Sequence, residues 1–234
     1  MIRESTDTSD VAARVQPAPR RRLRAEVRAH YEALLHRLPW PGAGSAGSPR
    51  TLGVSSCQGG EGVSTVAAHL AITAASLGDH PVVLVDANFA RPCVPRIFGV
   101  RGRPGLAEVL QNDHELSDAL QLSEVDNLSL LVSGRAVGGH SRVFGAPAME
   151  SLLKELGGEF GLVVVDLPAA DHSSAALQLA SRLDGILLVI EAGRVPCEAA
   201  RHVSSVLVRA GAHPLGVVLN KWRQDGPAWL FGTP

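Results

Sequence analysis

Lysine and tyrosine are almost missing from this chain of 234 residues. Its 22 basic residues include only two lysines, Lys154 and Lys221, and its single tyrosine is Tyr31. All aromatic residues together make up 4% of the chain. A site that needs a lysine can therefore draw on only two positions, and a segment that offers several tyrosines for phosphorylation is excluded.

Several other classes of protein are excluded by what is scarce. The three cysteines, Cys57, Cys93 and Cys197, are odd in number and far apart, which excludes a disulfide framework or a zinc knuckle and predicts a reduced, cytoplasmic protein. The net charge of -1 argues against a nucleic-acid partner. No apolar run approaches the roughly 18 residues of a membrane span, and no apolar segment near the N-terminus indicates a signal peptide.

The composition changes along the chain and suggests five parts. A cluster of arginines, Arg20–Arg28, opens an expected helix whose apolar face includes Tyr31. This cluster fits either a solvated helix start or a surface for anionic lipid. The expected parts are a disordered tail at 1–21, the helix at 22–38, a Gly/Pro/Ser linker at 39–49, one domain at 50–221 and a C-terminal tail at 222–234.

Apolar runs of strand length alternate with longer ones of helix length from residue 50 onward. Strands are expected at 51–56, 82–86, 128–132, 162–166, 185–190 and 215–220, and helices at 63–77, 105–111, 115–121, 146–156, 175–182 and 197–210. This alternation predicts a doubly wound, mostly parallel α/β sheet with helices on both faces. Ligands of such sheets bind at the carboxyl ends of the strands, which carry Gln58–Thr65, Asp86, Asp166, Glu191 and Asn220.

A glycine loop, Cys57–Thr65, follows the first strand of the domain and opens a helix. Backbone N–H groups and the helix dipole make such a loop a site for phosphate. The usual loop ends Gly-Lys-Ser/Thr, with the lysine on the β- and γ-phosphates and the hydroxyl on Mg²⁺. Here Gly62 and Ser64 keep their places, but Val63 stands at the lysine position, and no lysine or arginine occurs between Arg50 and Arg91.

Two aspartates strengthen the nucleotide-site interpretation. Asp86 ends the run VVLVD and Asp166 ends LVVVD, so both are expected at the carboxyl edge of the sheet. Each alone would be read as a cap of the following turn. Together with the loop, and in this order, they predict a nucleotide site in which Asp166 holds a Mg²⁺-bound water.

The segment 50–221 resembles the cytoplasmic domain of the bacterial tyrosine kinases of capsule and exopolysaccharide synthesis. These kinases are deviant-Walker P-loop ATPases, alongside the septum-placement and chromosome-partitioning ATPases. GGEGVST looks like the family's Pro-Gly-Glu-Gly-Lys-Ser-Thr, and VVLVDANFARP like its second Walker motif, Leu-Ile-Asp-Ala-Asp-Leu-Arg-Arg-Pro. GLVVVDLP is similar to Tyr-Val-Ile-Ile-Asp-Thr-Pro, and RPGLAEVL to the family's Pro-Gly-Leu segment, which favours the kinase branch.

The resemblance implies a P-loop NTPase-like fold that takes ATP or ADP with Mg²⁺. The residues expected to bind nucleotide, with Asn220 on the adenine, are Gly59, Gly60, Glu61, Gly62, Val63, Ser64, Thr65 and Asn220. Asp86 and Asp166 are the candidate catalytic residues, in vestigial form. Mg²⁺, where bound, is expected on Ser64, Asp86 and Asp166.

The chain also departs from the family pattern, and the departures concern activity. Besides the loop valine, Asn88 replaces the second carboxylate of the Asp-x-Asp pair, and no tyrosine follows Asn220. The ring-assembly helix, near Glu26–Glu32, lacks the family's arginine spacing, and Gly139–Phe144 largely loses a further family element. Charge neutralisation is central to phosphoryl transfer, so these changes predict weak nucleotide binding and weak or no ATP turnover.

The leading interpretation is a degenerate kinase-like subunit that regulates or scaffolds polysaccharide synthesis and export. Its expected partner is a membrane co-polymerase on a separate chain, which would recruit it to the inner face of the membrane; self-assembly is left open. One alternative is an active tyrosine kinase or ATPase with a substitute cation, for which Arg91 is the local candidate. Another is a partitioning or polar-localisation ATPase.

Overall fold

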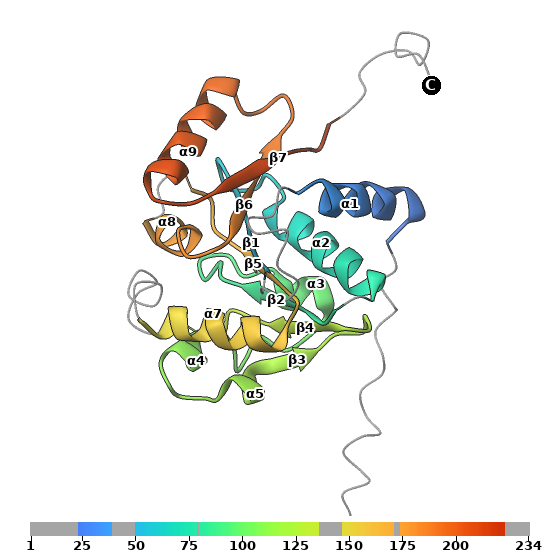
Figure 1. Cartoon of the computed structure of the whole chain (residues 1–234), viewed down its shortest axis with the longest axis vertical. Helices are drawn as coiled ribbons and strands as arrows, with labels where there is room; N and C mark the ends of the chain where they lie inside the picture. Colours follow the sequence, from blue (N-terminus) through green and yellow to red (C-terminus); the bar gives the residue numbers. More distant parts are fainter. Residues whose placement is uncertain (1–22, 39–49, 79, 136–146, 171–173, 223–234) are drawn as a thin grey trace, which may run out of the picture.

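Seven strands form one sheet in the computed structural model, which describes residues 23–38, 50–78, 80–135, 147–170 and 174–222 (Figure 1). The strands are β1 (Arg50–Ser56), β2 (Val82–Asp86), β3 (Leu120–Leu122), β4 (Leu128–Leu131), β5 (Leu162–Asp166), β6 (Gly185–Glu191) and β7 (Pro214–Asn220). Their order across the sheet is β3-β4-β2-β5-β1-β6-β7. All neighbouring pairs are parallel except β3 with β4.

Helices cover both faces of this sheet, as the alternating sequence predicts (Figure 1). One face carries α1 (Ala25–Arg37), α2 (Val63–Leu77) and α3 (Val94–Phe98). The other carries α4 (Leu106–Leu110), α5 (Leu116–Ala119), α7 (Pro147–Glu159), α8 (Ser174–Ala180) and α9 (Cys197–Arg209). Central strands such as β2 are buried along their whole length because apolar side chains on both faces meet a helical layer.

Helix α2 is apolar on nearly all sides because it lies between the sheet and α1. Its buried residues run from Val63 to Ala75, and α1 packs on its outer side through partly buried side chains such as Tyr31. The ring of Tyr31 meets the ring of His69 edge-on, with centroids 5.3 Å apart. Gly78 ends the helix in the left-handed conformation, at φ 79°.

Two elements differ from the sequence expectation. Residues 115–121 were expected to form one helix, but only Leu116–Ala119 are helical, and Leu120–Leu122 pair antiparallel with β4 at the edge of the sheet. Helix α3 was not expected at all. Its first N–H groups are bound by Asp86, which lies seven and eight residues earlier at the end of β2, so its capping signal is not within the helix.

Some expectations fall on residues that the structure does not describe. These are the tail expected at 1–21, the arginines at 20–22, the linker expected at 39–49, the segment Gly139–Phe144 and the tail beyond Trp222. Among the residues that are described, no helix combines the length and the apolar character needed to cross a bilayer.

Candidate nucleotide-binding site

The glycine loop crosses from the end of β1 to the start of α2 at the carboxyl edge of the sheet. It turns through two glycines in the left-handed region, Gly60 at φ 90° and Gly62 at φ 99°. The N–H groups of Val63, Ser64 and Thr65 then begin the helix, where no residue of the helix itself can accept from them. Free N–H groups at the start of a helix are where a phosphate can bind, so the phosphate-binding role of the loop stays a prediction that this backbone allows.

The Glu61 side chain stabilises the loop through hydrogen bonds to the loop backbone. Its side chain is fully buried, and its Oε2 accepts hydrogen bonds from the N–H groups of Cys57, at 2.8 Å, and Gln58, at 3.0 Å. The sequence places Glu61 among the nucleotide-binding residues. In the structure Oε2 is used within the loop and Oε1 accepts from the Glu191 N–H at 3.5 Å, so its backbone N–H is the group that it can offer to a ligand.

Three consecutive carbonyls of the loop accept hydrogen bonds from side chains at the ends of β6 and β7. The pairs are Arg194 Nη2 with Gly59 O at 3.4 Å, Lys221 Nζ with Gly60 O at 2.8 Å and Asn220 Nδ2 with Glu61 O at 2.8 Å. Glu191 Oε2 accepts from both Arg194 Nη1, at 2.9 Å, and Lys221 Nζ, at 3.0 Å. Sequence reasoning missed Arg194 and Lys221, although Lys221 directly follows Asn220.

A cavity of about 220 Å³ opens on the inner side of the loop. Its lining includes Gly59, Gly60, Gly62 and the first residues of α2, Val63, Ser64 and Thr65. Arg91 is the one basic residue among those that line it. Its Nη1 lies 3.7 Å from where a Cβ on Gly59 would stand. The Asn88 side chain secures the turn that carries Arg91, because its Oδ1 accepts from the Arg91 N–H at 3.2 Å.

Val63, the first residue of α2, is 8% exposed and belongs to the hydrophobic core on that face of the sheet. No positive charge therefore enters the cavity at the usual lysine position. Asn220, which the resemblance places on the adenine, is bound to the Glu61 carbonyl, and a Cβ on Gly62 would collide with its Nδ2. The adenine contact stays a prediction.

Asp86 and Asp166 meet at the sheet edge, in register across β2 and β5. Asp86 is fully buried and accepts three backbone hydrogen bonds at 3.1 Å, from Asn88, Cys93 and Val94. Asp166 is fully buried as well, but neither of its carboxylate oxygens has a hydrogen-bond partner of good geometry among the described residues.

Burial raises the pKa of both carboxyls. The pKa of Asp86 rises to about 6, with its three backbone hydrogen bonds opposing the shift. The pKa of Asp166 rises to about 8 through burial and the nearby Asp86 charge, and the Ser64 hydroxyl acts in the opposite direction. An unpaired buried carboxylate is costly, so Asp166 is a group that a proton or a cation would stabilise.

The oxygens present here suit magnesium. Carboxylates and a hydroxyl are ligands that Mg²⁺ accepts, and it commonly keeps several waters and takes the rest from nucleotide phosphates. Ser64, Asp86 and Asp166 supply such oxygens next to the loop. No group of three or more His, Cys, Asp and Glu side chains in the described part of the chain could hold a metal ion by itself. A magnesium here would therefore depend on a phosphate ligand.

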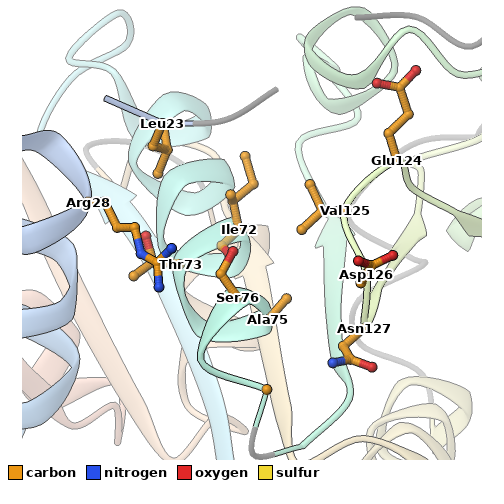
Figure 2. Close-up of a pocket in the computed structure, with 11 residues that line it drawn as sticks. Leu23, Arg28, Ile72, Thr73, Ala75, Ser76, Glu124, Val125, Asp126 and Asn127 are labelled. Atoms are coloured by element: carbon orange, nitrogen blue, oxygen red, sulfur yellow. The ribbon is translucent and has the colours of Figure 1, made fainter. Parts of the chain in front are cut away.

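A larger cavity, about 580 Å³, lies away from the loop (Figure 2). It opens between α2, the start of α1 and the turn before β4, with Arg28 on one wall and Glu124 and Asp126 on the other. Thr73 lines it with a fully buried hydroxyl that has no hydrogen-bond partner among the described residues. No residue of the glycine loop lines this cavity, so size alone does not identify the site of the chemistry.

Comparison with known proteins identifies a family and several relatives. Residues 48–225 match the family model described as "ParA: NUBPL iron-transfer P-loop NTPase". The chain is 29% identical to the tyrosine-protein kinase YwqD of Bacillus subtilis, over 77% of this chain and 76% of that protein. It is 31% identical to the succinoglycan biosynthesis transport protein ExoP of Rhizobium meliloti, over 74% of this chain but only 22% of ExoP.

Solved structures share the fold. The VpsO kinase domain superposes with a TM-score of 0.76 at 24% identity, over 85% of this chain and 95% of that one. The septum site-determining protein MinD of Pyrococcus horikoshii, complexed with Mg-ADP, gives a TM-score of 0.64 at 24% identity, over 78% of this chain and 75% of that one. The doubly wound, P-loop NTPase-like fold expected from the sequence is therefore confirmed, and a relative of that fold binds Mg-ADP.

Proposed function

The chain belongs to the ParA family of P-loop NTPases, and we propose that it is a catalytically degenerate, tyrosine-kinase-like member. In this proposal it acts as a regulatory or scaffolding subunit of capsule or exopolysaccharide synthesis, with weak or no ATP turnover. Its relatives YwqD, a tyrosine-protein kinase, and ExoP, a succinoglycan biosynthesis transport protein, support this setting. The iron transfer in the family model's description is not part of the proposal, because no group of three or more His, Cys, Asp and Glu side chains among the described residues could hold a metal ion.

The observation that carries the loss of turnover is Val63. This residue stands where the loop lysine would meet the β- and γ-phosphates, and its side chain is packed into the core. Losing one charge-assisted hydrogen bond costs about 1.5–3 kcal/mol of binding. The loss in rate is larger, because charge grows on the phosphoryl oxygens in the transition state. Asn88, in place of a second carboxylate, weakens the metal site further.

Weak nucleotide binding remains part of the proposal. The loop N–H groups at the start of α2 would hold the α- and β-phosphates, and Ser64, Asp86 and Asp166 would hold Mg²⁺, which neutralises phosphate charge when bound. Titration calorimetry with Mg-ATP and Mg-ADP tests this part. Measurable binding of either nucleotide, lost in Gly62→Val, is expected, because the left-handed Gly62 leaves no room for a side chain. No heat from either nucleotide would contradict it.

The proposed partner is a membrane co-polymerase on a separate chain, which would bring this protein to the inner face of the membrane. The succinoglycan biosynthesis transport protein ExoP supports the setting of polysaccharide export, and the region of ExoP that matches this chain is one part of that longer protein. The proposal also holds that Tyr31 is not phosphorylated. This tyrosine packs against His69, and burial raises its pKa. Phosphotyrosine on the purified chain after incubation with Mg-ATP would contradict it.

A second candidate function is an active kinase or ATPase that uses a substitute cation. Arg91 favours it, because its side chain lines the loop cavity. The two candidates differ in turnover: an active enzyme would hydrolyse Mg-ATP well above background, and Arg91→Gln would remove that activity.

A further inference from the structure

We propose that Lys221 and Arg194 are positioning residues which, with Asn220, hold the glycine loop in its phosphate-binding form from outside and replace part of the charge lost with the loop lysine. This inference rests on the nucleotide site of the proposed function and deepens it. Neither the motif nor the cavity contains these two cations, and no expectation from the sequence assigns them a role.

Three consecutive peptide groups of the loop point in a direction set by these side chains. In a trans peptide, C=O and N–H point in opposite directions. Each of three consecutive loop carbonyls is held by Arg194, Lys221 or Asn220, and none of these three side chains lines the cavity. The N–H groups of the next residues, Gly60, Glu61 and Gly62, therefore point away from the clamp. We define the loop clamp as Arg194, Asn220 and Lys221.

The positive charges of Lys221 and Arg194 also act on the loop N–H groups. A carbonyl that accepts from a cation polarises its peptide group, which makes the N–H on the other side a stronger donor. Lys221 acts in this way on the Glu61 N–H through Gly60 O, and Arg194 acts on the Gly60 N–H through Gly59 O. Positive charge thus reaches the anion across the backbone. The two side chains are 47% and 46% exposed, so water and salt reduce the effect.

Glu191 holds both cations in place. One carboxylate oxygen, Oε2, accepts from Arg194 and Lys221 together. The hydrogen bonds from Arg194 and then Lys221 lower the pKa of Glu191, which keeps it ionised at neutral pH. Because the pair is tied to Glu191 and to the loop carbonyls, neither cation serves as a free replacement for the missing lysine inside the cavity.

The backbone conformation of Lys221 also supports the clamp. Its φ is 56°, in the left-handed region. The other described non-glycine residues with positive φ are Asn112 and Asn127, of a type that tolerates this conformation, whereas lysine does not favour it. The turn that it makes directly after β7 brings the side chain to Gly60. A strained conformation of this kind persists when surrounding contacts fix it.

The test combines backbone exchange with nucleotide titration in four variants of the full chain: Lys221→Gln, Lys221→Arg, Glu191→Gln and Lys154→Gln. Lys154 is the matched control, because the other lysine of the chain pairs with Glu150 on the surface of α7. Hydrogen–deuterium exchange of the peptide that contains residues 59–62 is measured without nucleotide, and the Kd for Mg-ADP is measured by calorimetry.

Lys221→Gln and Glu191→Gln are expected to speed exchange in the loop and to weaken Mg-ADP about 3- to 10-fold. Lys221→Arg should keep most of the slow loop exchange and most of the Mg-ADP affinity of the wild type. Lys154→Gln should match the wild type in both measurements. Wild-type exchange in Lys221→Gln would overturn the clamp. Faster exchange with an unchanged Kd would overturn its role in phosphate binding. If the wild type binds no Mg-ADP, the nucleotide site and the phosphate role fail together, but the exchange result still decides whether the clamp holds the loop.

Discussion

Asp86 and Asp166 are neighbours across two parallel strands, yet only one of them is paired. Their Cα atoms are in register between β2 and β5. Asp86 anchors the following turn and the start of α3 through three backbone hydrogen bonds, whereas neither oxygen of Asp166 has a hydrogen-bond partner of good geometry among the described residues. Asp86 therefore has a structural role without any ligand, and Asp166 is the carboxylate that is left for one.

The pH dependence of stability follows from the raised pKa of Asp166. Between about pH 4 and its folded pKa of about 8, the folded chain binds more protons than the unfolded chain, so the free energy of unfolding falls as pH rises through this window. Asp166→Asn removes the buried charge. At pH 8 this variant should be more stable than the wild type by more than about 1 kcal/mol, measured by urea denaturation.

Asp113→Asn, at an exposed position, is the control for that experiment and should behave as the wild type. Mg²⁺ with ADP should raise the Tm more at pH 8.5 than at pH 6, since the cation needs the ionised carboxylates. A wild-type stability that does not change between pH 5 and pH 8 would contradict the assigned shift.

Restoring the loop charge is a second prediction. Val63→Lys should tighten Mg-ATP binding about 10- to 100-fold, because it returns one charge-assisted contact to the phosphates. The side chain begins in the core but lines the cavity, so a lysine can extend its ammonium toward the loop. Val63→Met is the control of similar length without charge. Equal affinity in the two variants would show that the cavity does not take phosphate.

Arg91 should account for part of the remaining affinity. Arg91→Gln is expected to weaken Mg-ATP about 3- to 10-fold, the effect of one partly exposed charged contact, with Arg91→Lys between this variant and the wild type. The measurement is the calorimetric Kd. An unchanged Kd in Arg91→Gln would remove this arginine from the site.

The buried hydroxyl of Thr73 gives a prediction on stability. Thr73→Val replaces an unpaired polar atom by a methyl group and should raise the free energy of unfolding by about 1 kcal/mol. Thr73→Ser keeps the hydroxyl and should bring no gain. A loss of stability in Thr73→Val would instead mean that the hydroxyl is satisfied in solution, for example by water in the adjoining cavity.

The sheet could be predicted from sequence because its central strands are continuous apolar runs. VVLVD and LVVVD became β2 and β5 without change of bounds. Strand β3 could not be predicted in this way. It has three residues, and Leu122 is 86% exposed, so no burial pattern marks it. Helix α3 could not be predicted for a different reason: its capping group is Asp86, which belongs to a separate element.

At the site, only those residues could be predicted whose role follows from the local sequence motif. The loop and the two aspartates follow strands, so their meeting could be inferred. The bracing role of Glu61 depends on its burial, and the clamp depends on the left-handed backbone at Lys221 and on the parallel register of β6 and β7. Composition pointed to the missing loop lysine but could not show that one of the two lysines in the chain approaches the loop from outside.

The most direct test of the central claim is the steady-state rate of Mg-ATP hydrolysis by the purified chain, compared with that of Asp166→Ala. A degenerate site with Val63 at the lysine position predicts a wild-type rate near background and no difference between the two proteins. Hydrolysis well above background that Asp166→Ala abolishes would contradict the account and identify the protein as an active enzyme.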